Sequence, residues 1–227
     1  MMERSRPPAE LLLRPPVRLQ GTTVELLPLE RAHWAGLLEA AADPRIWTYV
    51  LGGPRNTPES LEAALRRLEE EQERGVTLPF TVVSPVGSGR PVGQTQYMEI
   101  RREHRRAEIG GTWYAPSLWG TGVNVEAKYL LLRHAFDHEG LERVEFKTDE
   151  RNVRSQRALE KIGATREGVF RRHSITWDGF VRNSVYYSVI ASEWPSVRAR
   201  LETMLDALGR GPSPPGPAPR DASRDPP

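Results

Sequence analysis

The stretch Ala107–His138, AEIGGTWYAPSLWGTGVNVEAKYLLLRHAFDH, decides the fold because a strand, a tight turn and a helix follow one another in it. Residues 107–114 are rich in β-branched and aromatic side chains, and Pro116 ends the strand. From Val123 the apolar side chains recur at the spacing of one helical face, which predicts a helix over residues 123–138.

The turn between this strand and this helix is Trp119-Gly120-Thr121-Gly122. Free backbone N–H groups at the start of a helix converge on one point, and the helix dipole adds partial positive charge there. Glycine lets a ligand approach this backbone closely, so the turn suits a phosphate, although an ordinary turn between strand and helix would use the same residues. The third glycine of the dinucleotide fingerprint is replaced by Val125, and the Gly-Lys-Ser/Thr of a P-loop is absent.

Composition bounds the class of protein. With 227 residues, 38% hydrophobic, 27% charged and a net charge of +2, the chain suits one globular domain. It has no cysteine, which excludes disulfides and a cysteine acyl-enzyme. No apolar run has the length of a membrane span, so we expect a cytoplasmic protein without a membrane partner. The basic run over 101–106 is read as a solvated turn, and we expect no nucleic-acid partner.

The rest of the chain predicts one α/β domain between two irregular ends. Residues 1–16 are expected to be a flexible arm, residues 17–208 the domain, and residues 209–227 a disordered tail rich in Pro and Gly. Strands are predicted at 17–19, 24–27, 79–84, 91–100, 143–148, 165–177 and 180–190, and helices at 29–42, 57–74, 152–162 and 192–208 with Ser192 as a cap. This order implies a mostly antiparallel twisted sheet of about seven strands with flanking helices and one central parallel pair.

Three segments in this order resemble the GNAT superfamily of N-acetyltransferases, in particular the RimJ/RimL branch of ribosomal-protein acetyltransferases. They are AEIGGTWYAPSLWGTGVNVEAK, then RVEFKTDERNVRSQRALEKIGATREGVFR, and the hairpin sequence Trp177-Asp178-Gly179-Phe180-Val181-Arg182. The resemblance covers roughly residues 17–194. It implies an acetyl-CoA-dependent N-acetyltransferase whose central parallel strands splay apart. It also implies an amine acceptor, with a homodimer as an analogy only.

Two positions depart from the family's pattern. Ser117 stands where Gln or Arg usually precedes the glycines, so one side-chain contact to CoA is expected to be missing. Leu159 stands where many members have the tyrosine that donates a proton. These departures leave open an alternative, a non-catalytic CoA-binding or regulatory module of the same fold.

The resemblance assigns roles to particular residues of this chain. Residues expected to bind acetyl-CoA are Trp113, Trp119, Gly120, Thr121, Gly122, Val123, Asn124, Asn152 and Ser155. Glu108 is the candidate general base, acting through water, and its alternative is a surface carboxylate paired with one of the arginines at 101–106. Ser155 is the candidate proton donor to the leaving thiolate, or else it belongs to the cap of its helix.

The acceptor is expected to be a primary amine, such as a protein N-terminus, an amino acid or a small amine. Trp47 and Tyr49 lie in a loop that borders the acceptor site in the family, and core packing is the alternative for both. His134 and His138 have the spacing of two metal ligands on one helix, but no third ligand accompanies them, so we expect no metal.

Overall fold

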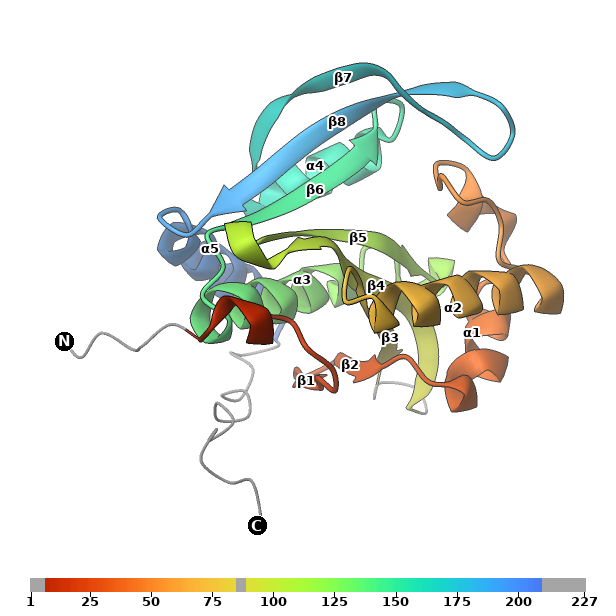
Figure 1. The fold of residues 1–227 in the computed structure, drawn as a ribbon, viewed down its shortest axis with the longest axis horizontal. Coiled ribbons are helices and arrows are strands. Elements are labelled where there is room, and N and C mark those ends of the chain that lie inside the picture. The colour runs from red at the N-terminus through yellow and green to blue at the C-terminus, as the bar shows by residue number, and fades with distance from the viewer. Residues whose placement is uncertain (1–6, 85–88, 210–227) are drawn as a thin grey trace, which may run out of the picture.

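Eight strands form one open sheet in the computed structural model, which describes residues 7–84 and 89–209 (Figure 1). The strand order is β1-β2-β3-β4-β5-β6-β8-β7, and within this described part only β5 and β6 are parallel neighbours. The bounds are β1 Leu19–Gln20, β2 Glu25–Pro28, β3 Leu78–Ser84, β4 Arg90–Arg101, β5 Arg106–Tyr114, β6 Arg143–Asp149, β7 Thr165–Ile175 and β8 Val181–Ile190. The mixed, mostly antiparallel sheet with one parallel pair is therefore confirmed.

Five α-helices among the described residues flank the sheet, and most of them begin or end at residues that the sequence marks. They are α1 Trp34–Ala40, α2 Pro58–Glu73, α3 Val123–Arg133, α4 Val153–Ile162 and α5 Trp194–Ala207. Thr57 caps α2 by accepting from the Ser60 N–H, and Asn152 caps α4 by accepting from the Ser155 N–H. A π-helical turn, η6 His134–His138, extends α3 to the predicted end.

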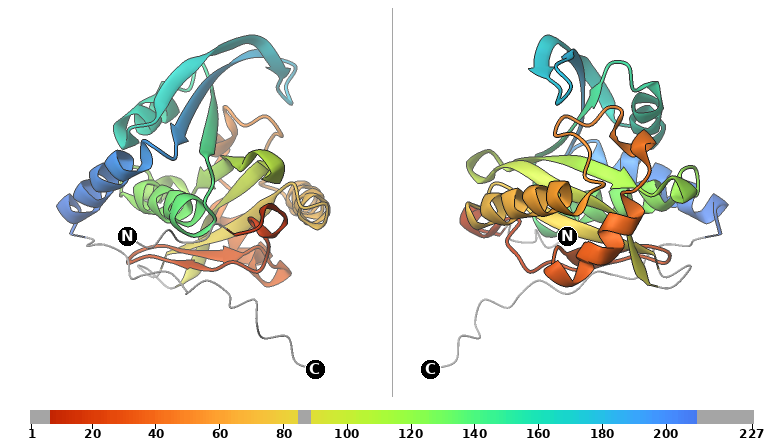
Figure 2. Two further views of the ribbon diagram at one scale, coloured as in Figure 1. Left: turned by 60° about the vertical axis from the view of Figure 1, so that its left-hand side comes forward. Right: turned by 90° about the vertical axis from the view of Figure 1, so that its right-hand side faces the viewer.

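The helices divide between the two faces of the sheet (Figure 2). On one face α3, α4 and α5 cover the main apolar core, and the Tyr97 hydroxyl from β4 donates to the Leu131 carbonyl of α3 at 2.5 Å. On the other face α1 and α2 pack around Trp47 and Trp113, whose ring centroids lie 5.3 Å apart. Because side chains alternate along a strand, the neighbours of Tyr97 in β4 point to the α2 face.

The central parallel pair is short, as the family resemblance implied. β5 and β6 are in register only from Arg106↔Arg143 to Glu108↔Glu145, and beyond this point they diverge (Figure 1). A bulge in β5 accompanies the divergence, since the register against β4 shifts between Gln94 and Gln96. Gly111 lies in this bulge with φ +57°, a conformation that favours glycine.

Two expectations at the ends of the chain need correction. The arm predicted for residues 1–16 is not loose throughout, because Leu12 and Leu13 are buried in the main core and the Leu13 N–H donates to the Glu139 carboxylate. Ser192 does not cap the last helix, because α5 begins at Trp194, and Glu193 holds the cap position without a side-chain capping bond. The predicted tail from residue 210 onward and the turn at residues 85–88 lie outside the described residues.

Candidate active site

A cleft of about 740 Å³ opens where β5 and β6 diverge. Residues from both faces of the sheet line it, so the cleft passes between the two strands and joins the α3 face to the α2 face. Of the residues predicted for the site, those that line the cleft are Tyr49, Glu108, Trp113, Trp119, Gly120, Gly122, Asn124, Asn152 and Ser155. Thr121, Val123 and Trp47 are not among the lining residues.

The N-terminus of α3 forms one end of the cleft. Gly120 and Gly122 have φ values of +80° and +90°, and no side chain from the described residues caps the helix. The first N–H groups of an α-helix have no partner within it, so these groups are available to a ligand. A Cβ atom on Gly120 would meet nothing within 4 Å, which leaves open space before the turn. The turn therefore fits a diphosphate.

Aromatic and cationic side chains hold this turn in place. The Trp119 indole N–H donates to the Tyr114 carbonyl at 3.1 Å, and the Arg154 guanidinium lies 3.8 Å from the centre of the Trp119 ring. The Thr121 hydroxyl donates to the Leu118 carbonyl at 2.7 Å, so Thr121 stabilises the turn from within. Arg154 comes from the first turn of α4, and its positive charge favours an anionic ligand at this end.

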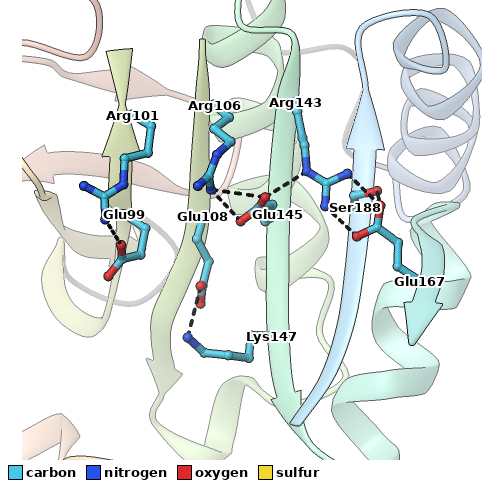
Figure 3. A network of polar contacts seen from close by, with 9 residues as sticks. All are labelled: Glu99, Arg101, Arg106, Glu108, Arg143, Glu145, Lys147, Glu167 and Ser188. Carbon is cyan, nitrogen blue, oxygen red and sulfur yellow. Dashed lines mark hydrogen bonds and ion pairs between the residues drawn. The ribbon is translucent and has the colours of Figure 1, made fainter. Parts of the chain in front are cut away.

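Glu108 lies at the point where the two central strands part. Its side chain is buried, at 3% exposure, and Lys147 Nζ donates to its Oε2 at 3.2 Å across the β5–β6 pair (Figure 3). Burial raises the pKa of Glu108, and the positive charge of Lys147 opposes this rise. The predicted alternative, pairing with an arginine at 101–106, is wrong, because Arg106 pairs with Glu145 and Arg101 with Glu99.

Ser155 approaches the cleft from the first turn of α4. The helix is capped by the Asn152 side chain, and Ser155 contributes only its backbone N–H to this cap. Within residues 7–84 and 89–209, the Ser155 hydroxyl forms no hydrogen bond. The hydroxyl of this half-buried residue is therefore available to a ligand in the cleft.

The two aromatic residues predicted for the acceptor site have different surroundings. Trp47 is 2% exposed, and its indole N–H donates to the Ala41 carbonyl, so the side chain belongs to the core rather than to the acceptor pocket. Tyr49 lines the cleft, and its carbonyl accepts from Arg182 at 3.3 Å. This contact joins the loop before α2 to strand β8.

Several charged or polar side chains in the cleft were missed by the sequence analysis. They are Arg55, Gln96, Lys128, Lys147 and Arg182, and Gln94 accepts a hydrogen bond from Arg55 without itself lining the cleft. Lys128 interrupts an apolar helix face, which is a signal that could have identified it. Burial lowers the pKa of Lys128 to about 8. Its ammonium lies 5.0 Å from the centre of the Phe146 ring. Arg55 follows Gly52-Gly53-Pro54, and no periodicity there distinguishes it.

No group of three or more metal-ligating side chains occurs in the part of the chain that the structure describes. Instead, His134 Nε2 lies 3.2 Å from Glu139 Oε1. The ring of His134 is tilted against that of His138, with the ring centroids 5.9 Å apart. No helix within residues 7–84 and 89–209 combines the length and the apolar character that crossing a bilayer requires.

Comparison with known proteins agrees with this geometry. The sequence model of the family described as Acetyltransferase (GNAT) domain matches residues 23–165. A putative acetyltransferase of T. thermophilus has 41% sequence identity and a TM-score of 0.75, covering 84% of this chain and 97% of that one. Mycobacterium smegmatis RimJ in complex with CoA-disulfide has 26% identity and a TM-score of 0.69, covering 86% and 94%.

A curated relative, the uncharacterized N-acetyltransferase YnaD of Bacillus subtilis, is 28% identical over 107 residues. This match covers 45% of the chain and 59% of the relative's own length. The chain belongs to the GNAT acetyltransferase family, since the family model matches more than half of it. It is therefore an acetyltransferase, and the family uses acetyl-CoA as the acyl donor.

Proposed function

We propose that this chain is an N-acetyltransferase of the RimJ/RimL type, which transfers the acetyl group of acetyl-CoA to a primary amine. The observation that carries the proposal is one cleft shared by the uncapped N-terminus of α3 and the buried carboxylate of Glu108. The T. thermophilus likeness supports an acetyltransferase, and the RimJ likeness supports the branch. The homodimer and the absence of a nucleic-acid partner stay predictions.

The α3 face is the side on which the turn would hold CoA. The backbone N–H groups from Trp119 to Asn124 would bind the diphosphate, since helix N-termini bind such anions. Asn152 and Ser155 border the same cleft from α4. Trp113 also lines the cleft, but its ring packs on the α2 face against Trp47. Acetyl-CoA supplies an acyl group activated as a thioester. The remaining chemistry belongs to side chains and amides of the chain.

The amine must be neutral to attack, and a lysine-type amine has a pKa of about 10.4. Glu108 would accept its proton through a water molecule, and burial makes this carboxylate a stronger base than an exposed one. The new N–C bond forms as the carbonyl π bond opens, and the backbone N–H groups around Gly111–Trp113 would stabilise the oxyanion that develops. The C=O bond then re-forms as the C–S bond breaks. Ser155 would give a proton to the leaving thiolate and regain one from solvent.

Direct attack of the amine in a ternary complex fits a chain without cysteine better than a covalent relay. In a cleft that passes through the sheet, two substrates can enter from opposite faces and meet between the strands. The α2 face, lined by Tyr49, Gln96 and Glu108, would then receive the acceptor.

The proposal is tested by measuring release of free thiol from acetyl-CoA with a panel of amines that includes short peptides, amino acids and polyamines. We expect calorimetric binding of CoA and turnover with at least one class of amine. Binding of CoA without turnover on any amine would favour the non-catalytic module. No heat of CoA binding by folded protein would refute the proposal altogether.

A further inference from the structure

A buried guanidinium lies on the acceptor side of the cleft, and no carboxylate of the described residues pairs with it. The Arg55 side chain lines the cleft and is 6% exposed. Its Nη1 donates to the Gln94 Oε1 at 2.9 Å, and within residues 7–84 and 89–209 it forms no ion pair. Buried charges in proteins are almost always paired, so an arginine bonded only to a neutral amide is an exception that calls for a partner.

The acidic group that attracts Arg55 is already engaged. Glu71 supplies this attraction, but its carboxylate accepts from the Thr77 hydroxyl at 3.3 Å and lies 3.7 Å from Arg67. Arg67 also lines the cleft and repels Arg55. The net charge of the side chains at this end of the cleft is therefore positive, and an anionic group of a ligand would neutralise it.

Arg55 is not placed to bind the phosphates of CoA. Its partner Gln94 lies two residues before Gln96 on β4, so the two side chains share one face of the strand. Gln96 lies opposite Gly110, beside the bulge. Gln94 also accepts from the Trp113 indole N–H at 3.3 Å, and Trp113 packs under α2. These contacts place Arg55 on the α2 face, whereas the diphosphate turn belongs to α3.

The distance from Arg55 to the reacting groups follows from the strand. Gln94 and Gln96 are two residues apart, so their Cα atoms are separated by about 7 Å. The bulge at Gly111, where the proposed function puts the thioester carbonyl, lies opposite this interval. An acceptor that reaches from the bulge to Arg55 would therefore span a few bonds, as in an amino acid or a short peptide.

A second buried arginine, Arg182, adds positive charge to the cleft. Arg182 is 4% exposed, lines the cleft, and donates to two neutral oxygens, those of Ser184 and of the Tyr49 carbonyl. Its charge faces Asp149 and Glu108 and is opposed by Arg151. Asp149 is in turn paired with Arg151 at 2.8 Å, so this carboxylate is already engaged.

We propose that the acceptor is a primary amine that also carries an anionic group, and that Arg55 binds this group on the α2 face. Guanidinium groups bind carboxylates and phosphates through paired, charge-assisted hydrogen bonds, so either anion has the required chemistry. The inference rests on the proposed acetyl transfer and narrows its acceptor. Simple polyamines, which carry no anion, are poor acceptors on this view.

The test compares acceptors that differ only in the anion. Glycylglycine is assayed against glycylglycine amide, and 3-aminopropylphosphonate against propylamine, with acetyl-CoA as donor. We expect kcat/KM to be roughly tenfold to a hundredfold higher for the anionic member of a pair, the range that a charged hydrogen bond provides. The pair with the larger ratio identifies the anion as carboxylate or phosphate.

The variant Arg55→Gln removes the charge, and Arg55→Lys keeps it without the planar fork. Both are expected to lower kcat/KM for the anionic acceptor by a larger factor than for its neutral partner, so that the ratio of the two values falls toward one. Arg66→Gln on the exposed side of α2 is the matched control and should change neither. Calorimetry with CoA should give the wild-type affinity for all three variants, which separates acceptor binding from cofactor binding.

An equal loss on anionic and neutral acceptors, or no preference for the anion in the wild type, would overturn the proposal. If no amine is acetylated, the proposed function fails instead, and binding of glycylglycine and 3-aminopropylphosphonate to the CoA complex is measured directly. Binding of either anion that Arg55→Gln weakens would still support the anion site. Absence of any such binding would contradict it.

Discussion

Glu108 shows how one residue obtains an unusual environment from its neighbours. Its carboxylate is buried beside the point where two strands part, and Lys147 donates a hydrogen bond to it from the adjacent strand. Burial disfavours the ionised carboxylate, whereas Lys147 favours it, so the pKa depends on the balance of the two. The net direction is upward, toward the range in which a general base works well.

We predict that Glu108→Gln lowers kcat by about 100-fold or more, the usual contribution of a general base. Ser155→Ala should lower kcat less, because water can also protonate a thiolate. The readout is the initial rate of thiol release at saturating acetyl-CoA. Glu103→Gln, at an exposed position of the 3₁₀ turn Arg102–His104, is the control and should leave the rate unchanged. Wild-type rates in both cleft variants would remove these roles.

The pH profile gives a second prediction. Because Glu108 must be ionised to act, activity should fall with decreasing pH below an apparent pKa that lies above that of an ordinary glutamate. Lys147→Met removes the charge that lowers this pKa, so the acidic limb should move to higher pH. A limb that stays in place in Lys147→Met would contradict the assignment. The control Glu103→Gln should keep the wild-type profile.

At the scale of elements, the bulge in β5 keeps the cleft open. Gly111 has φ +57°, and a Cβ atom there would lie 2.9 Å from the Gln96 side chain. We predict that Gly111→Ala destabilises the protein by about 1–3 kcal/mol, because the left-handed backbone and the contact both oppose the methyl group. The free energy of unfolding is measured by denaturant titration.

Gly168 in β7 is the matched control for this prediction. It is also a strand glycine beside a register shift, but its φ is ordinary and a Cβ atom would meet nothing within 4 Å. Gly168→Ala should therefore change stability by less than about 1 kcal/mol. Similar losses in the two variants would mean that the bulge has no special conformational requirement.

At the scale of the whole molecule, the sheet consists of two halves that meet at a short seam. β5 and β6 share three register pairs, and beyond them the cleft separates β1–β5 from β6–β8. The loop before α2 and strand β8 make a further contact through Tyr49 and Arg182. A ligand that fills the cleft would therefore bridge the halves and stabilise the folded state.

We predict that CoA at 100 times its Kd stabilises the fold by about 2.7 kcal/mol, the increment that mass action requires. For a domain of this size, this should raise Tm by roughly 5–11 °C in a thermal scan. Pantetheine, which lacks the diphosphate, is the comparison and should raise Tm much less at the same concentration. Equal shifts would show that the α3 turn does not dominate binding.

Much of the fold could be predicted because its signals are local. The cap residues Thr57 and Asn152, the Asp178-Gly179 hairpin turn and the apolar face of α3 act within a few positions of themselves. Hydrogen bonds of this range depend on the adjacent residues alone, so the sequence displays them directly. The misplaced Ser192 cap shows the limit, since α5 begins two residues later at Trp194, with Pro195 in its first turn.

The candidate site was predicted only where it coincides with such local signals. The α3 turn and Asn152 carry a local pattern, whereas Arg55 and Lys147 acquire their roles from partners 39 residues away. For Trp47 the sequence left an acceptor pocket and core packing open, and contact with Trp113 from another element decides for the core. Register between distant strands decides these contacts, and no periodicity within one segment reveals it.

The sequence by itself determined the order of strands and helices, the glycine turn before α3 and the family to which the pattern is similar. The tertiary structure decided which face each charge occupies, because the parting of β5 and β6 brings Glu108 and Lys147 together and leaves Arg55, among the described residues, bonded to an amide alone. The physical reason is one of range. Backbone conformation follows from neighbouring residues, but the burial and pairing of a charge depend on the whole packed sheet.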